Sequence, residues 1–270
     1  MKNPLVSIIV TTRNEERNIK NCMESINQQT YAPIQTIVVD NNSTDKTKAI
    51  AKKYINEVYN KGPERSAQRN FGAKKAKGSY VVFIDCDMNL TPEVIEQCVK
   101  KIDNFGGLVI PEESFGIGFW AKAKALERSF YLRNSAIEAA RFFPKKIFIT
   151  VGGFDEGLTG PEDWDLSQRV AIKYGIGRIS AFIRHNEGEL SLQRTIQKKY
   201  YYAKKFGPYI KKRDNKKSTQ QQFSIIGRYA LFFKQPKKMF KDPFLSMGML
   251  VMKTGEFVAG GLGYILSEKK

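Results

Sequence analysis

A run of five consecutive apolar residues, 80–84, constrains the fold of this chain more than any other stretch. Its aromatic and β-branched side chains suit a strand that is buried on both faces. The run ends in Asp85-Cys86-Asp87, at the end of a strand where open α/β sheets bind ligands. Two carboxylates this close favour a shared divalent cation that also holds a substrate diphosphate. Two capping aspartates on a surface turn are the alternative.

Strand-like and helix-like segments alternate along the chain. This alternation predicts an α/β fold with a mostly parallel central sheet flanked by helices. The expected strands cover residues 4–10, 36–39, 57–59, 80–84, 108–110, 142–154 and 179–183, and the expected helices cover residues 18–29, 46–54, 65–76 and 118–142. The layout is typical of nucleotide-binding proteins.

Polar side chains follow the first two predicted strands. They are Thr11, Asn14, Asp40 and Asn41. We expect them to line one crevice at the carboxyl edge of the sheet and to bind a base or a ribose. Arg65 and Arg69 lie one helical turn apart and are expected to reach phosphates. The sequence contains neither a Gly-x-Gly-x-x-Gly motif nor a Walker loop, which argues against a dinucleotide fold and a P-loop enzyme.

Charge is the strongest signal in the composition. Among 270 residues, 45 lysines and arginines face 27 aspartates and glutamates, which gives a formal net charge of +18. Such a surface suits a phosphate-bearing substrate, an anionic membrane or nucleic acid, but no zinc-finger or RNA-binding signature supports the last. Three cysteines without C-x-x-C spacing indicate a reducing compartment. The N-terminus lacks the pattern of a signal peptide, so we expect a cytoplasmic protein.

The polar motifs occur in the order and spacing of family 2 glycosyltransferases. Residues 11–15 (TTRNE), 40–45 (DNNSTD), 69–72 (RNFG) and 85–87 (DCD) resemble that family's motifs over roughly the first ninety residues. The resemblance implies the GT-A fold, with Mn²⁺ or Mg²⁺ bound to the D-x-D pair, Asp85 and Asp87, together with a sugar-nucleotide diphosphate. It also places Arg13 and Cys86 beside the nucleotide sugar. Asn41 stands where the family usually has a second acid, which leaves the base open.

A second acidic motif spans residues 160–166 (GPEDWDL), where helical spacing begins. It resembles the family's acidic ED motif, whose aspartate is the general base for the acceptor hydroxyl. The resemblance implies that Asp163 is the base and that Glu162 orients the acceptor, and we expect Trp164 to contact the acceptor. His185, the one histidine in the sequence, resembles a third metal ligand of many GT-A enzymes. A purely structural histidine is the alternative.

Basic and apolar residues dominate after residue 190. Lys198 and Lys199 are expected to close over the departing nucleotide and neutralise its diphosphate. Residues 244–266 are long enough to span a bilayer, but Lys253 and Glu256 favour an amphipathic helix on its surface. We therefore expect a catalytic domain over residues 1–210 and, over residues 211–270, a helical region for membrane association or dimerisation.

Together these features predict a metal-dependent inverting glycosyltransferase. Its expected partners are a nucleotide-diphosphate sugar and a glycan or lipid-linked acceptor, with peripheral contact to the inner face of the cell membrane. A homodimer is an open possibility, and no nucleic acid is expected. Three alternatives remain: a polyprenyl-phosphate sugar synthase, a nucleotidyltransferase, and a non-catalytic basic protein that binds a membrane or nucleic acid.

Overall fold

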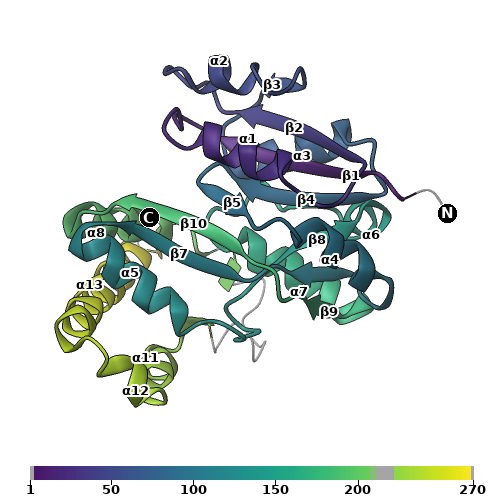
Figure 1. Ribbon diagram of the computed structural model, residues 1–270. Coiled ribbons are helices and arrows are strands. Elements are labelled where there is room, and N and C mark those ends of the chain that lie inside the picture. The colour runs from purple at the N-terminus through teal and green to yellow at the C-terminus, as the bar shows by residue number, and fades with distance from the viewer. Residues whose placement is uncertain (1–2, 208, 211–221, 269–270) are drawn as a thin grey trace. The chain divides into compact units, whose positions relative to one another are not determined.

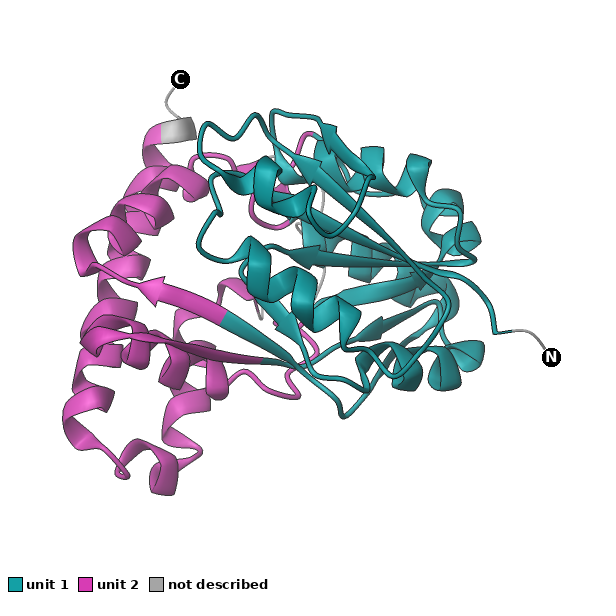
Figure 2. Ribbon diagram, turned by 45° about the horizontal axis from the view of Figure 1, so that its top comes forward, with its two compact units in different colours: residues 1–112, 139–156, 162–185 teal, residues 113–138, 157–161, 186–270 magenta. Residues whose placement is uncertain are grey.

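The computed structural model describes residues 3–207, 209–210 and 222–268. They form two compact units (Figure 2): unit 1 comprises residues 1–112, 139–156 and 162–185, and unit 2 comprises residues 113–138, 157–161 and 186–270. Unit 2 therefore includes segments that precede residue 210. The functional division at that residue stays a prediction.

A seven-stranded sheet forms the centre of unit 1 (Figure 1), in the order β3-β2-β1-β4-β8-β6-β9. Its strands are β1 (Val6–Thr12), β2 (Ile34–Asp40), β3 (Val58–Asn60), β4 (Tyr80–Asp85), β6 (Gly107–Val109), β8 (Ala140–Pro144) and β9 (Ile176–Arg178). Neighbouring strands are parallel except where β8 pairs with β4 and β6. The mostly parallel sheet expected from the sequence is confirmed.

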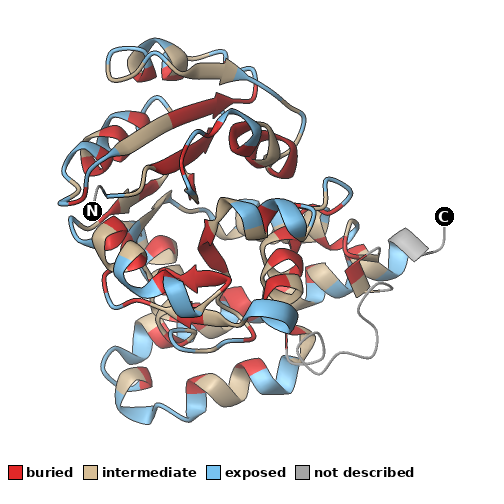
Figure 3. Cartoon of the chain, turned by 90° about the vertical axis from the view of Figure 1, so that its right-hand side faces the viewer, coloured by how far each residue is buried: buried red, intermediate tan, exposed pale blue. Residues whose placement is uncertain are grey.

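Helices cover both faces of this sheet. They are α1 (Ile19–Asn27), α2 (Thr47–Ala51), α3 (Arg65–Lys75), α4 (Val94–Lys101) with the short η1 (Ile102–Asn104), α6 (Lys145–Thr150) and α7 (Glu162–Tyr174). In β1, Ile8 and Val10 pack into a cluster with α1, α2 and α4. Ile9 packs into a second cluster with α3, α6 and α7. Because both faces are buried (Figure 3), the strands read as continuous apolar runs.

A second sheet has three strands in the order β5-β10-β7. They are β5 (Met88–Leu90), β7 (Glu112–Ile117) and β10 (Ile183–Glu189). β10 is antiparallel to β5, with His185 opposite Met88. The register therefore sets His185 beside Asp87, the residue before β5. The apolar run 179–183, predicted as a strand, instead leads into β10.

Unit 2 is mainly helical. Its helices are α5 (Gly118–Ser129), α8 (Leu192–Ala203), α11 (Ile225–Phe233), α12 (Pro236–Met239) and α13 (Pro243–Glu268). Four buried charges join α5 to α13: Lys124, Glu127, Lys253 and Glu256 alternate in a ring with N–O distances of 2.7–2.9 Å. Each carboxylate contacts both ammonium groups, so the buried charges are paired and neutral overall.

α13 is the apolar C-terminal helix expected from the sequence. Residues 243–266 are long and apolar enough to cross a membrane, with a mean hydropathy of 1.2 in the qualifying 18-residue window, and 33% of that window is buried. The ion ring shows that one side of α13 belongs to the interior of unit 2.

Two sequence predictions between residues 118 and 154 are wrong. The helix expected over 118–142 ends at Ser129, and Ala140–Pro144 forms strand β8 instead. Pairing with β4 and β6 overrides the local helical pattern there. The strand expected over 142–154 ends at Pro144, which has no amide hydrogen to continue the pairing. Residues 145–150 form α6, which buries Phe148 in the core.

The buried charges of unit 2 make its stability depend on pH through Lys199. Lys199 lies in α8, and a Cβ at Gly260 of α13 would be 3.7 Å from its Cγ. Burial and the nearby Lys253 lower its pKa from 10.5 to about 8, although Glu256 opposes this. Between pH 8 and 10.5 the unfolded chain therefore holds a proton that the folded chain has released.

We expect the free energy of unfolding to rise with pH across this window and the Lys199→Met variant to lose that contribution. The variant should also be more stable than the wild type at pH 7, where Lys199 is charged. Urea denaturation from pH 7 to 10 measures both effects, with Lys198→Met, at an exposed neighbouring position, as the control. Identical pH profiles for Lys199→Met and the wild type would contradict the assignment.

Candidate functional site

The carboxyl ends of β1, β2 and β4 bring polar residues to one edge of the sheet. The register sets Thr11 opposite Asp85 and Thr12 opposite Asp40. The Thr11 hydroxyl donates to Oδ1 of Asp85 at 2.8 Å. The strand ends singled out in the sequence therefore meet, as the parallel order requires.

Several of the predicted nucleotide-binding residues shape the loops at this edge. Buried Asp40 accepts a hydrogen bond from the Ser43 amide at 2.7 Å. Asn14, with a positive φ of 55°, accepts one from the Thr44 amide at 2.9 Å. Arg13 is exposed. These contacts fix the loops at the sheet edge, and direct contact with a nucleotide stays a prediction.

Asn41 is held by the loop that follows β3. Its side-chain amide nitrogen donates to the carbonyl of Pro63 at 2.6 Å. A Cβ at Gly62 would lie 2.4 Å from Oδ1 of Asn41, so the close approach requires glycine there. The sequence placed Asn41 at the crevice but gave no sign of this second contact.

Arg69 joins the two acidic motifs. Its guanidinium is fully buried and donates to Asp85 at 2.9 Å and to Oδ1 of Asp163 at 2.7 Å. Helix α3, which carries Arg69, is held against the sheet by Gln68. The side-chain amide of Gln68 donates to the Thr12 carbonyl at 3.1 Å and to the Val39 carbonyl at 2.7 Å. The ring of Phe154 lies 5.1 Å from the guanidinium carbon. The D-x-D strand and the start of α7 therefore converge on one cation.

Burial and neighbouring charges shift the pKa values of two carboxyl groups at this bridge in opposite directions. Burial favours a neutral Asp85, but Arg69, Arg65 and Arg141 hold its pKa well below the usual value. Burial and the adjacent Asp163 raise the pKa of Glu162, against the opposing effect of the arginines. Arg65, whose side chain is 42% exposed, lies 3.8 Å from Asp85 and 3.5 Å from Glu162.

Helix α7 presents the second acidic motif in its first turn. Asp163 is 27% exposed at its side chain, and its Oδ2 has no hydrogen-bond partner among the described residues. Trp164 is half-buried. Asp165 has a structural role, since it binds Arg169 at 2.7 Å, which in turn donates to the Gly153 carbonyl at 2.6 Å. Asp163 is thus the acid of this motif with an oxygen open to a ligand.

A second group of side chains surrounds His185. Nε2 of His185 lies 3.3 Å from Oδ2 of Asp87, and Nδ1 lies 3.3 Å from Oε2 of Glu112. Arg141 donates to the other oxygen of Glu112 at 2.7 Å. Glu112 and Arg141 were not predicted. Glu112 follows the short predicted strand 108–110, so its place after a strand was a usable signal, whereas Arg141 lay in a segment assigned to a helix.

The predicted metal ligands are only partly gathered. Asp87 and His185 meet, while Asp85 is paired with arginines. In the described ranges, no three His, Cys, Asp or Glu side chains are arranged to hold a metal ion. However, Oδ1 of Asp87 is buried and has no hydrogen-bond partner in that part of the chain. An orphaned carboxylate oxygen beside an imidazole fits a divalent cation that takes its other ligands from substrate phosphates.

Three predicted residues make none of the contacts described above. Cys86 packs in the core cluster, where contact with Cys22 and burial raise the pKa of its thiol. Lys198 and Lys199 belong to α8 of unit 2.

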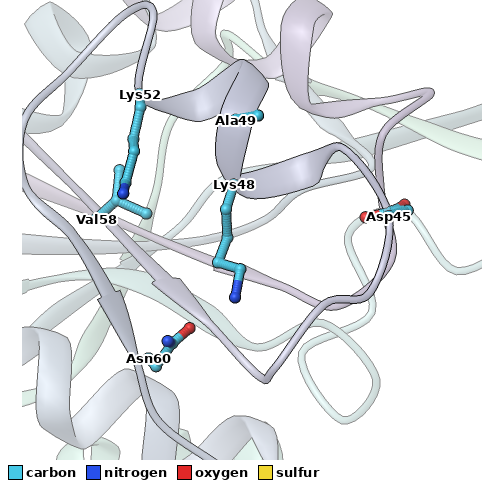
Figure 4. A pocket seen from close by; sticks show the side chains of 6 residues that line it. All are labelled: Asp45, Lys48, Ala49, Lys52, Val58 and Asn60. Carbon is cyan, nitrogen blue, oxygen red and sulfur yellow. The ribbon is translucent and has the colours of Figure 1, made fainter.

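A separate pocket of about 420 Å³ lies between α2 and β3 (Figure 4). It is lined by Asp45, Lys48, Ala49, Lys52, Val58 and Asn60, none of which belongs to the predicted site. Lys48 points toward Asn60 in the close-up. The contacts of Arg69 and His185, which define the candidate site, therefore lie outside this pocket.

Comparison with known proteins identifies the family. The sequence model described as "Glycosyl transferase family 2" matches residues 7–154, more than half of the chain. An uncharacterized glycosyltransferase of Rickettsia typhi is 31% identical over 182 residues, which cover 60% of this chain and 57% of that protein. The chain thus spans just over half the length of that relative. A GalNAc(5)-diNAcBac-PP-undecaprenol beta-1,3-glucosyltransferase of Campylobacter jejuni is 23% identical, with 92% and 90% of the two chains covered.

Solved structures show the fold. The mannosyltransferase PcManGT of Pyrobaculum calidifontis, solved in complex with GDP-Man and Mn²⁺, superimposes with a TM-score of 0.67 at 16% identity, covering 98% of this chain and 88% of that one. Staphylococcus aureus TarS (residues 1–349) gives 0.58 at 18% identity, with 94% and 80% covered. The GT-A fold expected from the sequence is confirmed.

Arg69 and Arg65 provide a matched test of the ionic site, because they lie one turn apart on α3 and differ in burial. Arg69→Met leaves buried carboxylates without their cation and should lower the free energy of unfolding by about 3–5 kcal/mol. Arg65→Met removes a longer, half-exposed contact and should cost less than about 1 kcal/mol. Urea denaturation of both variants measures the difference. Equal losses would refute the central role of Arg69.

Proposed function

The chain belongs to glycosyl transferase family 2, and we propose that it moves a sugar from a nucleoside diphosphate to an acceptor hydroxyl, with inversion at the anomeric carbon. The observation that carries the proposal is the Arg69 bridge. It sets Asp85, at the end of β4, and Asp163, on α7, against the two terminal nitrogens of one guanidinium. A donor diphosphate and an acceptor hydroxyl bound at these two motifs would be within reach of the same sugar ring.

In this proposal Asp163 is the general base. Arg69 occupies Oδ1, while Oδ2 takes the proton of the acceptor hydroxyl. The hydroxyl oxygen then attacks the anomeric carbon, and the bond to the diphosphate breaks with its electron pair on the leaving group. Glu162 is buried behind Asp163 and would orient the acceptor loop, while half-buried Trp164 would contact the acceptor. Partly exposed Arg65 is suited to bind the diphosphate.

Asp87 and His185 are the residues that would hold a divalent cation, Mn²⁺ or Mg²⁺. Such an ion would neutralise the charge that grows on the leaving diphosphate. Glu112 accepts from the Nδ1 side of His185, which directs Nε2 toward Asp87. Glu112 would therefore fix the orientation of the imidazole through its Nδ1 side.

The relatives favour a donor and an acceptor class. PcManGT was solved with GDP-Man and TarS with UDP and with UDP-GlcNAc, and the Campylobacter relative acts on an undecaprenol-linked glycan. We propose a nucleotide-sugar donor and a lipid-linked or cell-surface glycan acceptor, with the protein on the cytoplasmic face of the membrane. The family assignment argues against the non-catalytic alternative.

Asp163→Asn tests the reaction. UDP-glucose, UDP-GlcNAc and GDP-mannose are screened with Mn²⁺ and polyprenyl-diphosphate sugars, and the released nucleotide is identified. With the productive pair, Asp163→Asn should lower kcat about 10²–10⁴-fold while donor binding persists. Asp103→Asn, at an exposed position of unit 1, is the control. Full activity of Asp163→Asn toward a polyprenyl phosphate would instead support the synthase alternative, and release of pyrophosphate would support a nucleotidyltransferase.

Glu112→Gln tests the proposed cation site without catalysis. Weakening the partner of the imidazole should lower the affinity for Mn²⁺ about 10–100-fold, measured calorimetrically in the presence of UDP or GDP. The neighbouring Glu113→Gln, at an exposed position, should leave the affinity unchanged. A cation affinity that is the same in both variants would remove Glu112 and His185 from the proposed site.

A further inference from the structure

One side of α13 is exposed and apolar along the whole helix. Its exposed positions recur every three or four residues: Phe244, Met247, Val251, Thr254, Val258, Leu262 and Ile265. Phe244 is 71% exposed and Val258 is 59% exposed. The one hydroxyl in this series, on Thr254, is satisfied inside the protein by the Leu250 carbonyl at 2.8 Å and the Tyr229 hydroxyl at 2.6 Å. This outward face of α13 therefore carries no charge and no unmet polar side chain over residues 244–266.

The opposite side of α13 is fixed in the interior of unit 2. Lys253 and Glu256 are engaged in the buried ion ring with α5. Met249 and Met252 are fully buried in a cluster with Phe232 of α11. A membrane-spanning position would take both ring charges of α13 away from their partners and into hydrocarbon. The helix is therefore suited to lie along a surface, with one side packed against its own unit.

Basic residues accompany the apolar face at the N-terminal end of α13. Lys234, Lys237 and Lys241 are exposed among the exposed Phe233, Phe240 and Phe244. Within residues 222–266 the exposed charges are these three lysines and Asp242, so the charge of this surface is positive. Asp242 caps α13 by accepting from the Leu245 amide at 2.9 Å. Aromatic rings interleaved with lysines suit the headgroup region of a membrane with anionic lipids.

We propose that the outward face of α13, together with the exposed residues of α11 and α12, docks in the plane of an anionic lipid bilayer. Charge complementarity favours a bilayer over a second copy of the chain. A symmetric dimer would bring the same patch of two copies together. The described patch offers three exposed lysines and one carboxylate, so two copies would add repulsion, whereas anionic headgroups supply the missing charge.

Vesicle sedimentation with the full chain tests the proposal. The wild type should bind vesicles of phosphatidylcholine with 25% phosphatidylglycerol more tightly than phosphatidylcholine alone. Met247→Glu combined with Val258→Glu should abolish binding, while Ile149→Glu combined with Ile172→Glu, at exposed apolar positions of unit 1, should not. Changing Lys234, Lys237 and Lys241 to glutamine should weaken binding to the anionic vesicles by about 100-fold, near fivefold per lysine. Thermal unfolding checks that each variant is folded.

Two results would overturn the proposal. One is a wild-type chain that ignores anionic vesicles and forms a dimer that the Met247→Glu, Val258→Glu variant dissociates, as light scattering would show. The other is a vesicle-bound protein that resists extraction by alkaline carbonate, which indicates a spanning helix. Release by carbonate supports in-plane docking. No substrate is needed, so these outcomes are independent of the proposed role of Asp163.

Discussion

The buried guanidinium of Arg69 is the interaction on which the site depends. A cation fully removed from water is tolerated only because carboxylates meet it at hydrogen-bond distance from two directions. The same contacts tie the end of β4 to the first turn of α7, two elements separated by more than seventy residues in sequence. Arg69 therefore holds the two acidic motifs together, and replacing it would leave carboxylates of both motifs without this shared cation.

The two aspartates of the D-x-D motif have different surroundings. β4 ends at Asp85, and residues 86–87 form a turn, so the alternation of a strand no longer governs where Asp87 lies. Asp85 meets arginines, whereas Asp87 meets an imidazole and keeps one oxygen without a partner among the residues that the structure describes. Asp85 therefore has a structural role, whereas Asp87 keeps an oxygen that could bind a ligand. The close spacing of the two acids in the sequence suggested one shared role. The turn at residues 86–87 instead gives them different partners.

Much of unit 1 could be predicted from the sequence, because buried parallel strands leave a strong local signal. The runs around Ile9 and Phe83 are apolar without alternation, since helices cover both faces. The polar residues at the strand ends followed from the same logic. Prediction failed where pairing between distant segments decides the structure. Ala140–Pro144 lies in a segment whose local pattern predicted a helix, but it becomes a strand because β4 and β6 flank it.

Prediction of the candidate site failed for the same reason, because its contacts join distant segments. Sequence motifs identified Asp163 and Asp87, but the bridge through Arg69 to Asp163 depends on the packing of α3 against α7, which no local pattern encodes. Glu112 was missed because its partner His185 is placed by the register between β10 and β5, and Arg141 was missed because it binds Glu112 from a segment assigned to a helix. The ring of charges between α5 and α13 was not predicted from the sequence either. Its members belong to two separate helices, and no local pattern shows that they pair.

The family usually has an acid at the position of Asn41. The contact between Asn41 and Pro63 indicates what the amide does in place of that acid. A proline carbonyl can only accept, so the amide must present its nitrogen there. The oxygen lies against Gly62, where an added Cβ would be 2.4 Å away, so one loop contacts both ends of the amide. An ionised carboxylate has no hydrogen to donate, so only the neutral amide can close this contact with the Pro63 carbonyl.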